Sequence, residues 1–354
     1  MTLTPYKNIP INYYVEKEFA PFAKAIFGNT PEMMQFFSEK LGITFPWNKY
    51  SQIVVRDYVS GAMENTTAVV HGEQAYQKPG QLIDNNLQEN TIAHEILHHW
   101  FGNLVTSESW SNLTLNESFA NYGEYLWRAH KYGKTDAEMH YYDQVEAYKN
   151  GQNQGKNLVR FTYDEREELF DLVSYNKGGA ILHMLRTYLG DNAFFQGLKT
   201  YLETYKYDTA EAHQLRLIFE EITGQDLNWF FNQWYFGANH PNIEISYDYN
   251  TLRKSVTVNI KQIQTQTFKF PFAIDIFEGS KKTRHTVFVA SNDASFTFPY
   301  NKQPNLIQVN ADNVLVCNLY ENKILSEYIF QLKNADNFAH RRDALFQVAS
   351  KQDD

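Results

Sequence analysis

The sequence predicts an α+β fold in which a mainly helical part is followed by a small antiparallel β-sandwich and a short, truncated helical tail. All six tryptophans precede residue 240, as do most segments in which apolar residues recur at helical spacing. After Pro241, apolar and polar residues alternate, which is typical of half-buried strands. We therefore expect three regions, over 1–240, 241–319 and 320–354.

Capping residues and glycines mark the helices of the first region. Thr30 is a candidate N-cap with a proline at the first helical position, and Gly42 ends this segment. Asp191 is the candidate cap of a second segment with helical spacing of its apolar residues. Two further helices are expected over 209–224 and 227–237.

Short alternating segments mark the strands of the second region. Several such segments at short spacing favour a small antiparallel sandwich. From about residue 321 the spacing becomes helical again, but this last stretch is too short to bury its own apolar face. The expected strands lie at 243–249, 256–260, 270–276, 286–289, 295–298 and 306–309.

Composition and charge exclude several classes of protein. The chain has 354 residues, of which 32 are basic and 41 acidic, for a formal net charge of −9. No long Lys/Arg cluster provides the footprint of nucleic-acid binding. No apolar run approaches the ~18 residues of a membrane span, and the first residues lack the features of a signal peptide. The single Cys317 excludes an internal disulfide and a cysteine-rich zinc site. We expect a soluble protein with no nucleic-acid partner, in a compartment that the sequence does not identify.

The sharpest local signal is the run HEILH at 94–98, inside a segment over 91–104 whose apolar residues predict a helix. On a helix, His94 and His98 lie one turn apart on the same face, with Cβ atoms about 5–6 Å apart. Two imidazoles at this spacing can bind one zinc ion, and Glu95 can then reach a water without coordinating the metal. The alternative interpretation is an amphipathic helix with surface histidines.

A catalytic zinc needs a third protein ligand and an open fourth position. Glu117 follows His98 after eighteen residues, in the next helical segment over 115–122. Two antiparallel helices joined by 106–112 would bring Glu117 back to the metal. An Asn-Glu pair near a helix start is by itself an ordinary capping arrangement, but this spacing favours a ligand. We expect one Zn²⁺ per chain, bound by His94, His98 and Glu117.

Two further motifs accompany this pattern in order along the chain. The run GAMEN lies upstream at 61–65, and the run SYNKGG lies downstream at 174–179. Together with HExxH, eighteen residues and Glu, these motifs resemble peptidase family M1, the aminopeptidase N and leukotriene-hydrolase type of zinc enzyme.

The resemblance covers essentially the whole chain. It implies a thermolysin-like catalytic domain over about 1–240, a β-sandwich domain after it, and the start of the family's large helical domain beyond about 320. The family normally begins with a large N-terminal β domain, which has no counterpart in this sequence. We therefore expect a fragment that lacks that domain and most of the helical domain.

The resemblance also implies residues that contact the substrate. Tyr175 matches the family's phenol that stabilises the developing oxyanion, although an arbitrary one of the 24 tyrosines would more often be structural. Glu64 matches a carboxylate that would pair with the α-ammonium of a peptide, with a solvated Glu at a strand-edge turn as the alternative. The expected substrate-binding residues are Gly61, Ala62, Met63, Glu64 and Asn65.

Two more carboxylates have expected roles. Glu95 would take a proton from the attacking water and pass it to the leaving amine. Glu124 lies two helical turns after Glu117 on the same face. It either orients a ligand histidine or occupies an ordinary solvated position.

These features predict a zinc aminopeptidase that releases single residues from peptides with a free N-terminus. One alternative is a bifunctional epoxide hydrolase and aminopeptidase of the leukotriene-hydrolase kind, although Ala62 favours plain aminopeptidase N. A second alternative is a non-catalytic scaffold on the same fold, against which the intact zinc motif argues. The side-chain preference of the first pocket and the oligomeric state stay open.

Overall fold

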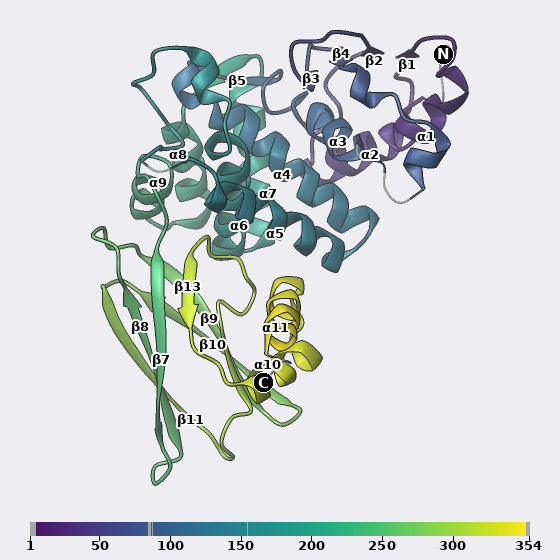
Figure 1. The fold of residues 1–354 in the computed structure, drawn as a ribbon. Coiled ribbons are helices and arrows are strands. Elements are labelled where there is room, and N and C mark those ends of the chain that lie inside the picture. Colours follow the sequence, from purple (N-terminus) through teal and green to yellow (C-terminus); the bar gives the residue numbers. More distant parts are fainter. Residues whose placement is uncertain (1–4, 84–85, 87, 154, 352–354) are drawn as a thin grey trace. The chain divides into compact units, whose positions relative to one another are not determined.

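The structure is a computed structural model, and its described residues form two compact units (Figure 1). Unit 1 comprises Met1–Gly133 and Leu158–Leu227, and unit 2 comprises Lys134–Asn157 and Asn228–Asp354. Unit 1 is mainly helical and unit 2 contains a β-sandwich, so the predicted α+β class is confirmed. The described residues are 5–83, 86, 88–153 and 155–351.

A small mixed sheet forms the first part of unit 1. Its strands are β1 (Ile11–Tyr14), β2 (Tyr50–Val54), β3 (Ala62–Met63) and β4 (Ala68–His71). The order is β1-β2-β4-β3, in which β1, β2 and β4 run parallel and β3 pairs antiparallel with β4. Strand β3 is therefore an edge strand. The sequence analysis did not predict this sheet, because its strands are too short to show a clear alternation.

Helices make up most of the rest of unit 1. The α-helices are α1 (Ala23–Phe27), α2 (Thr30–Leu41), α3 (Glu89–Leu97), α4 (Thr114–Lys131), α6 (Gly178–Leu189), α7 (Asp191–Tyr205) and α8 (Ala212–Thr223). Shorter elements are η1 (Ala20–Phe22), η2 (Glu73–Ala75), η3 (Pro79–Leu82), η4 (Trp110–Asn112), η5 (Arg166–Leu169), the π-helical turn η6 (Val173–Lys177), and the parallel strand pair β5 (Val105–Ser107) and β6 (Asp208–Ala210). Helix α4 packs against α3, α6 and η6, so it lies at the centre of the helical part.

Two predicted helix caps are wrong by one residue. Asn29 precedes α2, and Thr30 lies inside the helix, where its Oγ1 donates to the Phe27 carbonyl at 2.7 Å. Gly190 precedes α7 with φ of 81°, so Asp191 begins the helix and its charge favours the positive end of the helix dipole. In both cases the chain enters the helix one residue earlier than the capping pattern indicates.

The β-sandwich of unit 2 contains all six expected strands. They are β7 (Asn242–Asn250), β8 (Ser255–Gln262), β9 (Phe270–Glu278), β10 (Lys281–Val289), β11 (Asp293–Pro299) and β12 (Leu306–Val309). A further strand, β13 (Asn318–Glu321), pairs parallel with β7 and was not predicted. The two sheets have the orders β10-β9-β12 and β11-β8-β7-β13. Their alternating apolar residues are buried, among them Val256, Val258, Ile260, Phe272 and Ile274.

Four helices belong to unit 2: α5 (Lys134–Asn150), α9 (Asn228–Trp234), α10 (Leu325–Asn334) and α11 (Phe338–Ser350). Helix α11 packs against α5. The Phe338 amide donates to Glu138 Oε2 at 2.8 Å, and Arg342 Nη1 donates to the Tyr142 hydroxyl at 2.7 Å. Helix α5 lies inside the predicted region 1–240, so the observed packing crosses that boundary. The three sequence-based domains stay predictions.

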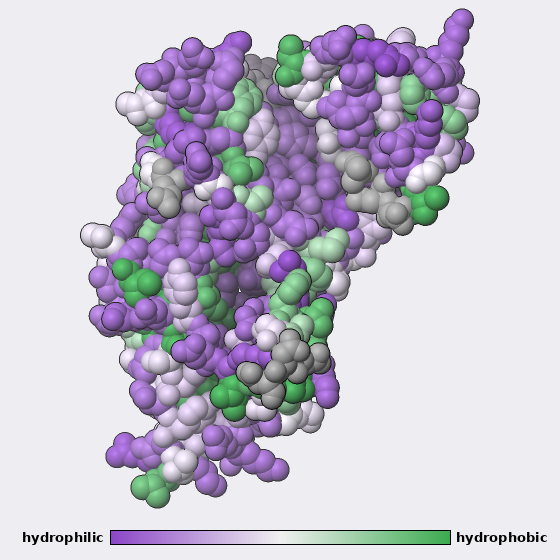
Figure 2. Space-filling view, in the orientation of Figure 1, coloured by the Kyte–Doolittle hydropathy of each residue, from purple (hydrophilic) through white to green (hydrophobic). Residues whose placement is uncertain are grey.

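Part of the surface of α10 and α11 is apolar. Figure 2 shows hydrophobic side chains exposed in this part of unit 2, and the exposed residues include Ile324, Leu325, Ile329, Leu345 and Phe346. Among the described residues, no helix combines the length and the apolar character that a membrane crossing requires.

A buried histidine makes the stability of unit 1 sensitive to acid. His71 Nε2 donates to Gln52 Oε1 at 3.0 Å, and Gln52 Nε2 donates to Thr30 Oγ1 at 2.8 Å. Burial lowers the pKa of His71 to about 4. The unfolded chain binds this proton near pH 6.5, so the free energy of unfolding should fall as the pH drops from 6.5 to 4, by up to about 3 kcal/mol. Urea unfolding between pH 4.5 and 7.5 measures this loss.

The variant His71→Gln isolates the contribution of this one group. It cannot titrate, so between pH 4.5 and 6 it should lose less stability than the unmodified chain, by about 1.4 kcal/mol per pH unit. Replacing the exposed His213 by Gln is the matched control for the same change at a surface position. Parallel profiles for His71→Gln and the unmodified chain would contradict the prediction.

Candidate functional site

The two histidines of the HEILH run lie at the C-terminal end of α3. His94 is in the last turn and His98 is the C-cap residue, and their ring centroids are 4.8 Å apart. The expected helix over 91–104 is too long, because α3 ends at Leu97. The chain turns away there, with Gly102 at φ of 130°, a conformation that favours glycine.

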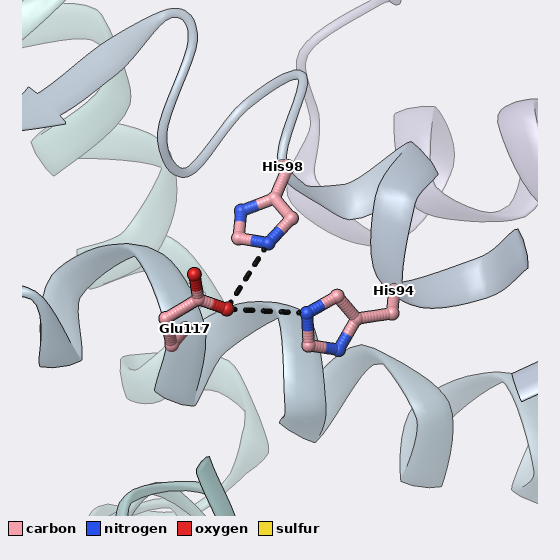
Figure 3. Close-up of side chains that lie close together, drawn as sticks. All are labelled: His94, His98 and Glu117. Carbon is pink, nitrogen blue, oxygen red and sulfur yellow. Dashed lines mark hydrogen bonds and ion pairs between the residues drawn. The ribbon is translucent and has the colours of Figure 1, made fainter. Parts of the chain in front are cut away.

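Glu117 completes a buried cluster with these histidines. It lies in the first turn of α4, which packs against α3. Its Oε2 is 3.2 Å from His94 Nε2 and 3.3 Å from His98 Nε2 (Figure 3). The three residues are at most 8% exposed, and their candidate ligand atoms all lie within 4.8 Å of one another. The structure thus brings together all three residues that the sequence analysis named as metal ligands.

The hydrogen bonds of the rings decide which nitrogens face Glu117. His98 Nδ1 donates to the Phe101 carbonyl at 3.0 Å, and His94 Nδ1 donates to Glu124 Oε1 at 3.0 Å. Each neutral ring therefore presents the lone pair of Nε2 to the Glu117 carboxylate. Three electron-pair donors converge on one point, which is the chemistry of a cation site. Glu124 contacts His94 as expected of a carboxylate that orients a ligand.

The charges around this cluster also favour a cation. Burial opposes protonation of His98, but the Glu64 and Glu117 carboxylates outweigh it and raise the pKa of His98 to about 9. Burial likewise opposes protonation of His94, yet Glu117 and Glu124 hold its pKa well above the usual range. The pocket has an excess of negative charge that either protons or a metal ion can neutralise.

Glu95 lies beside the cluster without belonging to its three ligands. The residue is 5% exposed, and its Oε2 has no hydrogen-bond partner among the residues that the structure describes. Burial raises the pKa of Glu95 to about 7. A carboxyl group with this pKa exchanges protons readily near neutral pH.

The GAMEN segment borders the cluster through its glutamate. Glu64 Oε1 is 4.0 Å from His98 Nδ1. Glu64, Glu95 and His98 form a second set of side chains whose candidate ligand atoms lie within 4.8 Å of one another. The Glu64 carbonyl accepts a hydrogen bond from Asn103 Nδ2 at 2.8 Å, which fixes the backbone at this point. The rest of the segment follows edge strand β3, where Gly61, Met63 and Asn65 are exposed and Ala62 is half-buried.

Tyr175 approaches the cluster from η6. Its ring stacks on the His94 ring, with centroids 5.8 Å apart and an interplanar angle of 14°, and its phenol lies within electrostatic range of the Glu117 carboxylate. Burial and the neighbouring Glu117 raise the pKa of Tyr175, so the phenol stays a hydrogen-bond donor.

The residues that support η6 were not predicted from the sequence. Arg160 pairs with Asp171, and Ser118 Oγ donates to the Ser174 carbonyl at 2.6 Å. An aspartate just before an apolar helical run is a capping signal that would have indicated Asp171. Nothing local indicates Arg160, because its partners lie in another segment.

Comparisons with known proteins agree with this geometry. Residues 26–234 match the model of the peptidase family M1 domain. Aminopeptidase N of Streptomyces lividans is 31% identical over 239 residues, which cover 64% of this chain and 28% of that protein. Glutamyl aminopeptidase of Bos taurus is 26% identical over 323 residues, which cover 87% of this chain and 34% of that protein. The chain thus spans about a quarter to a third of the length of such relatives.

The fold is also found in a solved structure. The crystal structure of Legionella pneumophila aminopeptidase A in complex with aspartic acid matches with a TM-score of 0.87 at 16% identity, and the match covers 98% of this chain and 41% of that one. The family match extends over more than half of the residues, and all three ordered motifs lie inside it. The chain belongs to peptidase family M1.

Proposed function

We propose that the chain carries the active site of a zinc-dependent aminopeptidase, which releases N-terminal residues from peptides. The observation that carries this proposal is the convergence of His94 Nε2, His98 Nε2 and Glu117 Oε2 beside the Glu64 carboxylate. The named relatives are aminopeptidases, which supports the same class of reaction.

One zinc ion per chain fits the donor set. Two imidazole nitrogens and one carboxylate oxygen are the protein ligands of many catalytic zinc sites. When bound, zinc supplies Lewis acidity that polarises a peptide carbonyl and makes water a stronger acid. Glu124 would orient His94 by accepting the Nδ1 proton, which keeps Nε2 available as a ligand.

Two residues would act on the reacting atoms. Glu95 would accept the proton of the attacking water at Oε2 and deliver it to the leaving amine. Tyr175 would donate its phenolic proton in a hydrogen bond to the carbonyl oxygen as negative charge develops there. The raised pKa values of both groups suit these roles, because Glu95 exchanges a proton near neutral pH and Tyr175 keeps its own.

Glu64 would confer specificity for the free N-terminus. A free α-ammonium is a compact cation with three donors, and a half-buried carboxylate next to the scissile bond is its natural partner. Because β3 is an edge strand, an extended peptide could pair with its backbone on the side away from β4. Because this arrangement would fix the substrate by its free N-terminus, cleavage would follow the first residue, which makes the protein an exopeptidase.

A first prediction concerns the metal. His98→Ala removes one of three ligands, so stoichiometric zinc should be lost on dialysis. Glu95→Gln should keep one zinc per chain while turnover nearly disappears, because Glu95 is not a ligand. Metal analysis and hydrolysis of an aminoacyl anilide measure the two effects.

His99→Gln is the matched control for the metal prediction. His99 neighbours a ligand, but its Nδ1 donates to the Glu95 carbonyl and its Nε2 accepts from the Thr67 amide. This variant should retain zinc. Full zinc occupancy in His98→Ala would show that the site is misplaced.

A second prediction tests the exopeptidase function. Glu64→Gln should lower kcat/KM for an unblocked aminoacyl anilide by roughly 10- to 100-fold, the value of a hydrogen bond to a charged group. This loss should appear mainly as a rise in KM, because the substrate ammonium pairs with Glu64 in the ground state as well as in the transition state. The N-acetylated anilide should be a poor substrate for the unmodified protein.

Glu73→Gln is the control for Glu64. Glu73 is a glutamate of η2 that pairs with Arg56 at the surface, so its replacement should leave the kinetics unchanged. If the acetylated and free anilides were hydrolysed equally well, the proposed exopeptidase function would be wrong.

A third prediction concerns the phenol. Tyr175→Phe should lower kcat by roughly 10²–10³, the range observed when one oxyanion donor is removed, while KM and zinc content change little. Tyr207→Phe, at a position that is 70% exposed, should have no effect. A fall in KM comparable to the fall in kcat would contradict a role confined to the transition state.

A further inference from the structure

The turn that carries Tyr175 has an unusual anchor beneath it. The Arg160 guanidinium donates two hydrogen bonds to the Asp171 carboxylate, from Nη1 to Oδ2 at 2.7 Å and from Nη2 to Oδ1 at 3.0 Å. This two-point geometry fixes the orientation of both groups, which a lysine cannot do. The two side chains are only 10% and 16% exposed.

Asp171 in turn bonds to the backbone of η6. Its Oδ1 accepts hydrogen bonds from the amides of Val173 and Ser174 at 3.0 and 3.1 Å. Its carbonyl accepts the Tyr175 amide at 3.1 Å. The first turn of η6 is therefore capped by a carboxylate whose own position Arg160 determines.

Arg160 also reaches η6 directly. Its Nη2 donates to Ser174 Oγ at 2.7 Å and to the Leu169 carbonyl at 3.1 Å, and Ser174 Oγ donates to the same carbonyl at 2.6 Å. All of these bonds end on residues just before Tyr175. The guanidinium thus holds the segment that leads into the phenol, and its atoms do not reach the metal cluster.

The opposite side of η6 is tied to the metal cluster. Ser118 Oγ donates to the Ser174 carbonyl at 2.6 Å, and Ser118 directly follows Glu117 on α4. Because the Tyr175 ring also stacks on the His94 ring, the position of the phenol relative to the metal cluster is fixed from both sides. π-Helical turns of this kind occur frequently at functional sites, where they present a side chain in an irregular direction.

We propose that Arg160 is a positioning residue that holds the Tyr175 phenol in place through Asp171 and Ser174. This inference rests on the proposed function, since it assigns Arg160 to the oxyanion donor of that reaction. A largely buried ion pair contributes little net stability, so geometry is the better explanation of this pair. Small displacements of a reacting group can cost large factors in rate.

Arg160→Lys is the most informative variant. It keeps a cation opposite Asp171, so folding is preserved, but a single ammonium cannot bond both carboxylate oxygens, Ser174 Oγ and the Leu169 carbonyl together. In the zinc-loaded protein, kcat should fall roughly 10-fold while KM and zinc content stay within twofold. In a Tyr175→Phe background, Arg160→Lys should cause no further fall in kcat. An equal loss in both backgrounds, or no loss in either, overturns the proposal.

Amide hydrogen exchange provides a readout that does not depend on activity. The amides of Val173 and Ser174 should exchange at least tenfold faster in Arg160→Lys, with or without zinc, and unchanged exchange overturns the proposal. This measurement separates the two claims. An unmodified protein without peptidase activity would refute the proposed function, whereas the exchange rates test only whether Arg160 holds η6 in place.

Arg216→Met is the matched control. Arg216 pairs with Glu220 on α8 at 2.6 Å, and the two side chains are 14% and 19% exposed, so this pair resembles the Arg160 pair in burial. The substitution leaves the Glu220 carboxylate without its ion-pair partner, which should lower stability without changing exchange at Val173 and Ser174 or altering kcat. If Arg216→Met reproduced the kinetic effect of Arg160→Lys, a general loss of stability would account for both and the positioning role would be refuted.

Discussion

His94 Nε2 and His98 Nε2 lie 3.2 and 3.3 Å from Glu117 Oε2, in a pocket from which the fold largely excludes water. Buried electron-pair donors that face one another are unfavourable unless a cation lies between them. The Nδ1 atoms of His94 and His98 donate hydrogen bonds to Glu124 and to the Phe101 carbonyl, so they cannot donate to Glu117. Unit 1 therefore keeps these three atoms together at a cost that ring protons or a bound metal ion can offset.

Helix α4 must approach both α3 and η6 closely for this arrangement, and glycines permit it. A Cβ at Gly123 would lie 2.6 Å from Leu97 Cδ2, and a Cβ at Gly178 would lie 1.8 Å from Ser118 Oγ. Glycine inside a helix costs about 1 kcal/mol relative to alanine. Gly123 carries this cost inside α4, and close packing sets the distances between Glu117, the two histidines and the Tyr175 phenol.

Local periodicity predicted the parts of the molecule that depend on local geometry. The spacing of His94 and His98 follows from one helical turn, and the strands from 243 to 309 follow from alternation. The end of α3 was missed, because Gly102 and the bond from His98 to Phe101 act against the apolar stripe. The parallel strand β13, the sheet of unit 1 and the packing of α5 with α11 depend on long-range contacts, which periodicity does not encode.

The arrangement of α4 and η6 explains why so many hydrogen bonds end on Ser174. Glu117 and Ser118 are consecutive, so a shift of α4 moves the Glu117 carboxylate and the support of η6 together and preserves the distance to the Tyr175 phenol. A shift of η6 alone changes that distance. The amide of Ser174 bonds to Asp171, its carbonyl to Ser118, and its hydroxyl accepts from Arg160. All three polar groups of the residue before the phenol are therefore fixed, and they restrain the motion to which the reaction would be most sensitive.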